Sequence, residues 1–200
     1  MKGAFIVFEG IDGSGKSSCM EAAASVLEKR TDVIRTSEPT KGEIGMLLRS
    51  SPDITAEAEA QLFVADRALH TNEIKKWVAD GKVVLCDRYY ASTIAYQSAN
   101  LDGRFADADW LTEINDKVIT EPDLTILFDI DPEKGMERVE SRGAKSKFES
   151  LAYLKEVREN YLNIAKERNF AIIDASRQRE EVLDDVLELI NNVLKTEGHQ

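Results

Sequence analysis

Short apolar stretches alternate with longer amphipathic ones along most of this chain. The short stretches are rich in β-branched residues, as the buried strands of a parallel sheet are. They predict strands at 4–9, 32–37, 82–87, 124–130 and 170–174. The intervals between them carry helical spacing. This alternation is typical of an α/β fold, with a parallel sheet whose strands are connected by helices.

Several helices carry recognisable end signals. A long helix is expected from Thr55 to Ala79, because the following Asp80-Gly81 is a natural stop. Asp131-Pro132-Glu133 predicts a helix start, with the aspartate as N-cap and proline in the first turn. Two further helical faces are indicated by Phe148, Leu151, Leu154, Val157, Tyr161 and Ile164, and by Val182, Leu183, Val186, Leu187, Ile190, Val193 and Leu194. Without repeats or linkers, residues 1–200 are expected to form one domain.

The first strand runs directly into a glycine-rich loop of the form G-x-x-x-x-G-K-S, followed by a helical run from Ser18 to Lys29. Glycines let backbone N–H groups turn toward phosphate oxygens, the lysine reaches the terminal phosphates, and the serine hydroxyl can hold Mg²⁺. An ordinary glycine-rich turn lacks this strand and helix context. We therefore predict a nucleoside triphosphate site at Gly10, Ile11, Asp12, Gly13, Ser14, Gly15, Lys16, Ser17 and Ser18.

Charge and cysteine content narrow the class of partner. The chain has 26 Lys and Arg against 37 Asp and Glu, a net charge of −11, so nucleic acid and anionic membranes are unexpected partners. No apolar run is long enough to cross a bilayer, and the N-terminus does not resemble a secretory signal. Cys19 and Cys86 lack metal-like spacing and are expected to be buried, reduced thiols of a cytoplasmic protein. Because the chain as a whole is acidic, a polyanionic ligand needs a local group of Lys and Arg side chains to bind to it.

Asp87-Arg88-Tyr89 ends the third predicted strand, on the sheet edge where ligands of such folds gather. The aspartate can join the Mg²⁺ shell, together with Ser17, and the planar guanidinium of Arg88 suits a phosphate. The same residues also suit a structural Asp–Arg pair that caps the strand.

Phe63 and Arg67 lie on one side of the long helix, so an aromatic plane and a guanidinium are presented together. That pairing suits a base to stack and a phosphate to hold, although a core Phe beside a solvated Arg fits equally well. Residues 92–97 add hydroxyl, amide and phenol groups that can read a base edge or simply line a polar helix surface. His70 is expected on a helix surface and His199 in a frayed tail.

A basic segment stands out in the acidic chain. Arg138, Arg142, Lys145 and Lys147 bracket a glycine-containing stretch between two helices. We predict a closing lid at about 138–150 that brings positive charge, above all from Arg138 and Arg142, to the transferred phosphoryl group. A solvated basic turn is the alternative.

These motifs together resemble the thymidylate kinase family, in its bacterial and archaeal type. The resemblance rests on residues 8–18, Glu38-Pro39, Phe63 with Asp66-Arg67, residues 87–97 and residues 138–143, in the family's order. It implies a three-layer P-loop kinase fold, with five parallel strands flanked by helices, usually as a homodimer. It also implies transfer of a phosphoryl group from MgATP to dTMP, a step in dTTP synthesis.

The resemblance assigns roles to individual residues. Lys16 and Ser17 would hold the ATP phosphates and Mg²⁺, and residues 174–176 would face adenine. On the acceptor side, Asp12 would contact the sugar 3′-hydroxyl, Phe63 would stack on thymine, and Arg67 would approach the base and the monophosphate. The remaining acceptor contacts would be Glu38, Arg88 on the monophosphate, Thr93 and Gln97 near the base, and Tyr96 beneath the 2′ position, where it would exclude a ribose hydroxyl.

Two positions depart from the family pattern. Ser37 stands where an arginine often precedes Glu-Pro, so Glu38 is expected to lose an ion partner. Gly13 stands where eukaryotic members carry an arginine in the loop, which directs the search for catalytic charge to the lid and above all to Arg142. We expect Arg142→Ala to lower kcat far more than it raises the KM for dTMP.

Two other functions are compatible with a phosphate-binding loop. A deoxynucleoside kinase would need a carboxylate base for its protonated hydroxyl acceptor, and Glu9 or Asp87 is available in the sequence. A kinase that accepts a broader range of nucleoside monophosphates is part of this first alternative. A non-catalytic nucleotide-dependent switch is the second alternative, but it would leave the acceptor-side arginines without a role.

Overall fold

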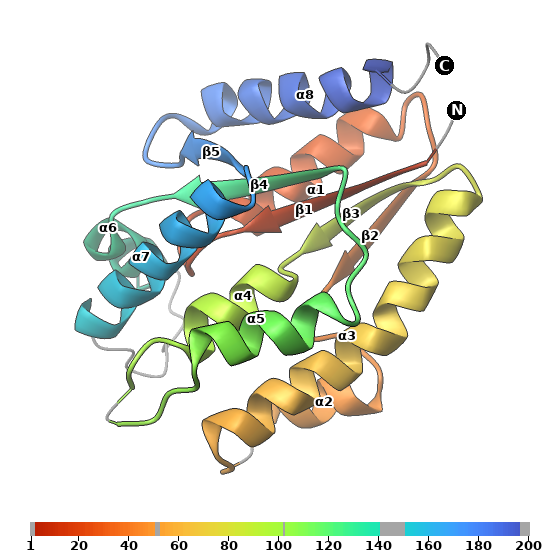
Figure 1. Cartoon of the computed structure of the whole chain (residues 1–200). Coiled ribbons are helices and arrows are strands. Elements are labelled where there is room, and N and C mark those ends of the chain that lie inside the picture. Colours follow the sequence, from red (N-terminus) through yellow and green to blue (C-terminus); the bar gives the residue numbers. More distant parts are fainter. Residues whose placement is uncertain (1–2, 51–52, 102, 141–150, 197–200) are drawn as a thin grey trace.

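The computed structural model describes residues 3–50, 53–101, 103–140 and 151–196. Its centre is a five-stranded sheet in the order β2-β3-β1-β4-β5, in which every neighbouring pair is parallel (Figure 1). The strands are β1 (Ala4–Glu9), β2 (Val33–Ser37), β3 (Val83–Asp87), β4 (Leu124–Asp129) and β5 (Ala171–Asp174). Each predicted strand is confirmed to within one residue at either end.

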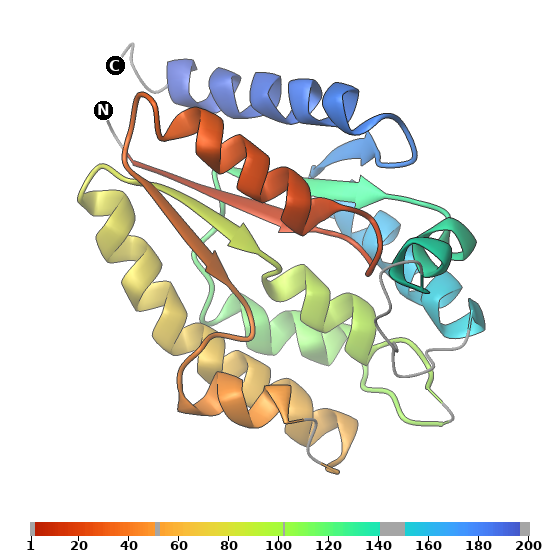
Figure 2. The ribbon, with the colours of Figure 1, turned by 180° about the vertical axis from the view of Figure 1, so that it is seen from behind.

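Helices cover both faces of the sheet, which confirms the expected three layers. Helices α1 and α8 lie on one face, and α3, α4, α5 and α7 lie on the other (Figures 1 and 2). The helices of the described residues are α1 (Lys16–Leu27), α2 (Glu43–Arg49), α3 (Ala56–Ala79), α4 (Tyr90–Gln97), α5 (Ala108–Asp116), α6 (Pro132–Glu140), α7 (Leu151–Glu167) and α8 (Arg179–Thr196).

The central strand β1 is buried along its whole length, because it has neighbours on both edges and helices on both faces. Phe8 stacks on Phe128 of β4 with ring centroids 5.8 Å apart, and Phe5 meets Tyr89 edge to face at 5.1 Å. An apolar run without alternation is what a strand enclosed on two faces requires. The rigid strand fixes the position of the loop that leaves its carboxyl end.

The predicted helix ends are confirmed where the structure describes them. Helix α3 stops at Ala79, and Gly81 follows with φ 82°. The carboxylate of Asp131 accepts a hydrogen bond from the backbone N–H of Glu133 at 2.8 Å, so it caps α6 as expected. The apolar faces of α7 and α8 pack on the core, whereas Phe148 lies outside the described residues.

Both cysteines are unpaired. Cys86 is buried as predicted, while Cys19 is only half-buried against the core. Burial raises the pKa of Cys19 to about 11 and holds the pKa of Cys86 well above its ordinary value. In the part of the chain that the structure describes, no helix has the length and apolarity needed to span a membrane.

Candidate active site

A cradle of backbone N–H groups forms where β1 ends. Gly10, Gly13 and Gly15 have φ values of 141°, 83° and 90°, a region that residues with a Cβ rarely adopt. Helix α1 begins directly afterwards at Lys16, and no side chain caps its N-terminus. Its first N–H groups are therefore available to an anion, which the helix dipole also attracts. The predicted phosphate loop has the geometry that a triphosphate needs.

Lys16 is buried in this cradle, with its Nζ 3.6 Å from a carboxylate oxygen of Asp12. Burial, together with the nearby Arg88 guanidinium, lowers the pKa of Lys16. Burial also opposes ionisation of Asp12, but Arg88 and Lys16 outweigh it and hold the pKa of that carboxyl below its ordinary value. An arriving phosphate would favour the charged lysine.

Ser17 and Asp87 meet at the mouth of the cradle, as the sequence predicted. The Ser17 hydroxyl donates to one carboxylate oxygen of Asp87. The other oxygen, Oδ1, is buried without a hydrogen-bond partner in the described structure, and so is the Ser14 hydroxyl. An orphaned carboxylate oxygen beside a serine hydroxyl is a donor set that fits Mg²⁺.

Seven of the eight predicted acceptor-binding residues surround one cavity of about 190 Å³. The cavity lies between the turn after β2 and helices α3 and α4. Its walls are Glu38, Phe63, Arg67, Arg88, Thr93, Tyr96 and Gln97, together with Pro39, Tyr89 and Ser92. The eighth residue, Asp12, lies beside it and is bonded to Arg88. The volume of the cavity is below the usual range for ligand pockets, roughly 300–1,000 Å³, so the cavity suits one ring system better than a whole nucleotide.

Arg67 is buried, so the alternative of a solvated arginine on α3 is wrong. Its Nε and Nη2 converge on one oxygen of Glu38 at 2.8 and 2.7 Å. Nη2 also donates to the Thr93 hydroxyl at 3.0 Å, and Nη1 donates to the side chain of Asn115 on α5. The ring of Tyr89 lies 5.4 Å from the guanidinium carbon. The arginine is therefore held rigidly at the wall of the cavity.

Glu38 has two strong partners, which corrects the expectation drawn from Ser37. Besides Arg67, it accepts a hydrogen bond from Nδ1 of His70 at 2.9 Å. His70 was predicted on a helix surface, but it is buried, with 2% exposure. Its Nε2 lies 2.7 Å from the Thr36 hydroxyl. Near Ser37 itself, Arg49 of α2 donates to the carbonyl oxygens of Pro39 and Thr40.

Arg88 connects the acceptor cavity to the phosphate cradle. It lies in the left-handed region with φ 69°. Its guanidinium donates to Asp12 at 2.6 Å and stands over the Tyr96 ring, 5.0 Å from the centroid. The same group donates to the Ser92 hydroxyl at 3.2 Å. One cation therefore faces both the ring-sized cavity and the loop that is predicted to hold phosphate.

Glu9 is fully buried beneath this cavity and is occupied by protein donors. It accepts hydrogen bonds from the Tyr89 backbone N–H at 2.8 Å, the Ser92 hydroxyl at 2.6 Å and the Tyr161 hydroxyl at 3.1 Å. Burial raises the pKa of Glu9 despite these bonds. With its oxygens taken, Glu9 supports the structure of the site and is poorly placed to accept a proton from a substrate.

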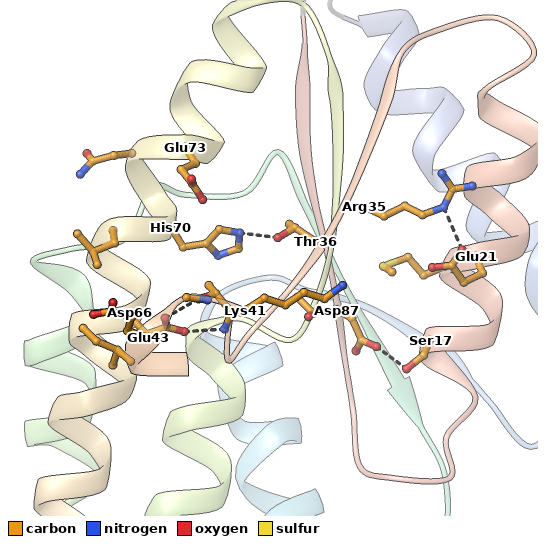
Figure 3. A pocket seen from close by; sticks show the side chains of 17 residues that line it. Ser17, Glu21, Arg35, Thr36, Lys41, Glu43, Asp66, His70, Glu73 and Asp87 are labelled. Atoms are coloured by element: carbon orange, nitrogen blue, oxygen red, sulfur yellow. Dashed lines mark hydrogen bonds and ion pairs between the residues drawn. The ribbon is translucent and has the colours of Figure 1, made fainter. Parts of the chain in front are cut away.

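A larger cavity of about 1030 Å³ lies between α1, β2 and α3 (Figure 3). Ser17 and Asp87 lie at one end of it, and the His70–Thr36 pair lies on the wall shared with the acceptor side (Figure 3). Asp66 accepts hydrogen bonds from the Thr40 N–H and hydroxyl and so fixes the turn at its rim. None of the residues predicted to bind the base lines this cavity.

Of the predicted lid, the structure describes only the stem. Arg138 on α6 donates to the carbonyl oxygen of Ala175 at 2.9 Å, beside the loop at 174–176. Arg142, Lys145 and Lys147 lie outside the described residues, as does His199. The lid at 138–150 and the catalytic role of Arg142 stay predictions.

Sequence reasoning missed two polar residues of the acceptor site, His70 and Asn115. Asn115 is fully buried on α5, and its amide nitrogen donates to the Leu111 carbonyl oxygen at 2.7 Å. The sequence signal that could have placed these two residues on a buried helix face was their helical spacing. His70 follows Arg67 by three residues and Asn115 follows Leu111 by four, so each shares a buried face.

Comparison with known proteins agrees with this geometry. A profile of the family described as "Thymidylate kinase" matches residues 8–186. A "Probable thymidylate kinase" of Pyrobaculum aerophilum is 41% identical, covering 96% of this chain and 98% of the relative. One of Archaeoglobus fulgidus is 40% identical over 94% and 95%. A "Thymidylate kinase" of Nitratidesulfovibrio vulgaris is 38% identical over 95% and 97%.

Proposed function

Because the chain belongs to the thymidylate kinase family, we propose that it transfers the γ-phosphoryl group of MgATP to dTMP and yields ADP and dTDP. The observation that carries the proposal is the position of Arg88. Its guanidinium lines the ring-sized cavity and also bonds to Asp12 of the phosphate loop. With the base of the acceptor in the cavity and the donor triphosphate in the cradle, the phosphates of the two nucleotides would lie near one cation.

On the acceptor side, Phe63 offers an aromatic plane for stacking, and Arg67 offers the second N–H of Nη1 for the base edge. Thr93 and Gln97 complete the base contacts, and Arg88 takes the monophosphate. Tyr96 limits the room near the 2′ position, and Asp12 receives the 3′-hydroxyl. The thymine methyl is worth about 1–3 kcal/mol in an apolar pocket, so dUMP is expected to be roughly 10–200-fold poorer.

The reaction needs no protein base on the acceptor. The second pKa of a monophosphate is about 6, so its oxygen is already a nucleophile at neutral pH. This suits a site in which Glu9 is enclosed and Asp87 is bonded to Ser17. Lys16 would neutralise charge on the transferred group, with Arg138 and Arg142 proposed as further cations. The deoxynucleoside kinase alternative would need Glu9 or Asp87 as its base, and both carboxylates are engaged by protein donors.

Mg²⁺ is proposed as the metal of this reaction. Ser17 and the orphaned Oδ1 of Asp87 are the groups that would hold it or its water shell. Together with ATP, Mg²⁺ would neutralise part of the charge on the phosphates. The protein holds these oxygens in place beside Lys16 at the start of α1.

We further propose a single domain over residues 1–200, a homodimer, and a cytoplasmic location. The dimer proposal is supported by exposed apolar side chains on adjacent helices, namely Met46 and Leu47 of α2 and Leu69 of α3. The location is supported by two unpaired cysteines and by ATP as substrate.

A panel of acceptors tests the proposal. ADP release is measured with MgATP and dTMP, dUMP, UMP, dGMP or thymidine at equal concentrations. We expect dTMP to give the highest kcat/KM, with UMP below dUMP. A preference for thymidine would establish a deoxynucleoside kinase instead. ATP binding without turnover of any monophosphate would establish a nucleotide-dependent switch.

A further inference from the structure

His70 and Glu38 form the wall between the two cavities of the acceptor side. Glu38 lines the small cavity. His70 lines the large one (Figure 3). Both side chains are buried, at 5% exposure for Glu38 and 2% for His70, and they are joined by the 2.9 Å hydrogen bond from His70 Nδ1 to Glu38 Oε1.

The direction of this hydrogen bond is fixed by chemistry. Glu38 Oε2 is bonded to the Arg67 guanidinium, and an ionised carboxylate can only accept hydrogen bonds. Nδ1 of His70 must therefore carry a proton toward Oε1. The Thr36 hydroxyl, 2.7 Å from Nε2, can donate or accept and so holds the ring in this orientation in either protonation state of Nε2.

The two carboxylate oxygens of Glu38 consequently have different hydrogen-bond partners. Oε2 receives both Nε and Nη2 of Arg67, and Oε1 is held by His70. If His70 released Oε1, the carboxylate would be free to rotate and the Arg67 fork would lose its fixed plane. Arg67 keeps Thr93 and Asn115 as partners, but its Nε edge would no longer be held in one direction.

We propose that His70 is a positioning residue for the acceptor: by bonding Glu38 it fixes the Arg67 guanidinium against the base of the monophosphate. The inference rests on the proposed function. It assigns base selectivity to a chain of contacts that begins at Thr36 and ends at Arg67. Fixed donors favour a carbonyl at the pyrimidine 4-position, as in dTMP, over an amino group, as in dCMP.

Two amide substitutions separate the two nitrogens of the ring. An asparagine amide can occupy the place of Nδ1, whereas a glutamine amide reaches the place of Nε2. We expect His70→Asn to keep the KM for dTMP within about threefold of the natural chain. His70→Gln and His70→Leu should raise it about tenfold, the size of a lost hydrogen bond to a charged group. The KM for ATP should stay within about twofold, and the preference for dTMP over dCMP should fall in parallel with the loss of dTMP affinity.

Thr36→Val tests the far end of the chain of contacts without touching a buried charge. It should raise the KM for dTMP by less than His70→Gln does, and in the same direction. The matched control is Thr125→Val on β4. Thr125 is buried and lines neither of the two cavities. This variant should leave the KM for dTMP unchanged.

The outcomes are distinct. Equal KM values for dTMP in the three His70 variants, or parallel rises in the KM for both substrates, would reduce His70 to a structural residue. An unchanged selectivity for dTMP over dCMP would lead to the same conclusion. If the natural chain turns over dTMP, such results overturn only this inference. If the natural chain does not turn over dTMP at all, the proposed function fails first.

Discussion

At the scale of single residues, the site is marked by buried oxygens that the protein itself does not satisfy. Among the described residues, Ser14 Oγ, Asp87 Oδ1 and Tyr90 Oη are buried without partners, and two of these three lie at the phosphate cradle. A buried polar atom without a partner costs roughly 1–3 kcal/mol. At Ser14 and Asp87 this cost is consistent with a bound phosphate or metal supplying the missing contact.

Asp87→Asn tests the proposed metal corner. The amide keeps the size of the side chain but removes the charge that attracts Mg²⁺. We expect the apparent affinity for Mg²⁺ to fall by about 10–100-fold, with activity partly restored at high Mg²⁺. The measurement is the rate of ADP release as a function of Mg²⁺ at fixed ATP. Asp80→Asn, an exposed aspartate after α3, is the control, and an unaltered Mg²⁺ dependence in Asp87→Asn would contradict the assignment.

At the scale of elements, helix α6 packs its backbone directly against the phosphate loop. A Cβ built on Gly13 would lie 2.0 Å from the carbonyl oxygen of Gly135. Gly13 also has φ 83°, so both space and conformation require glycine. An arginine here, as in eukaryotic members of the family, would have to displace α6. Under the proposed function, the catalytic charge would therefore come from another part of the chain.

Gly13→Ala should therefore destabilise the protein and weaken ATP binding together. Left-handed strain alone costs about 1–3 kcal/mol, and the collision with Gly135 adds to it. Urea unfolding and the KM for ATP provide the two measurements. Gly103→Ala is the matched control, because Gly103 has φ 86° but open space around its Cβ position. If both variants lose equal stability, the contact with α6 contributes nothing.

The sequence predicts long or enclosed elements well and short ones poorly. The five strands were found because buried parallel strands are continuous apolar runs, and α3 was found because Asp80-Gly81 ends it. Helices α2 and α5 were not given bounds, since seven and nine residues offer too few turns for a clear period. In the site, the acceptor-side motif residues were brought together as predicted. His70 and Asn115 were missed because their helical spacing to Arg67 and Leu111 shows a shared face but does not show that a polar residue on this face is buried.

At the scale of the whole molecule, two helices that pack against each other, α2 and α3, carry exposed apolar side chains. Leu69 is 62% exposed, Met46 55% and Leu47 48%. Exposed apolar side chains on adjacent helices of a highly charged protein suit a contact surface. Helix α2 follows β2 at one edge of the sheet, whereas the exposed Ile172 lies on β5 at the opposite edge.

Leu69→Glu should convert the proposed dimer into a monomer, because like charges from two copies would meet across the interface. Sedimentation or light scattering measures the mass in solution. Ile172→Glu introduces the same charge on the other edge and should leave the mass unchanged. A natural chain that sediments as a monomer would disprove the dimer, and an unaltered dimer in Leu69→Glu would place its interface elsewhere.

Stability at high pH should depend on Tyr89. Burial raises its pKa to about 12 from the ordinary value of about 10. Between these values the unfolded chain releases the phenol proton while the folded chain retains it, so the free energy of unfolding falls as the pH rises. Two pKa units correspond to roughly 3 kcal/mol. Urea unfolding at about pH 9 and about pH 11.5 should show a smaller loss in Tyr89→Phe than in the natural chain; equal losses would contradict this.

The state of the two thiols has a practical consequence for spectroscopy. Alkylating reagents attack thiolates, and neither Cys19 nor Cys86 is appreciably ionised at neutral pH. Asp32 is exposed and directly precedes β2, at the amino ends of the strands and so away from the active site. A cysteine introduced there would react faster than either native thiol. A fluorophore could then be attached there without first removing the native cysteines, and substrate-driven motions followed in otherwise unmodified enzyme.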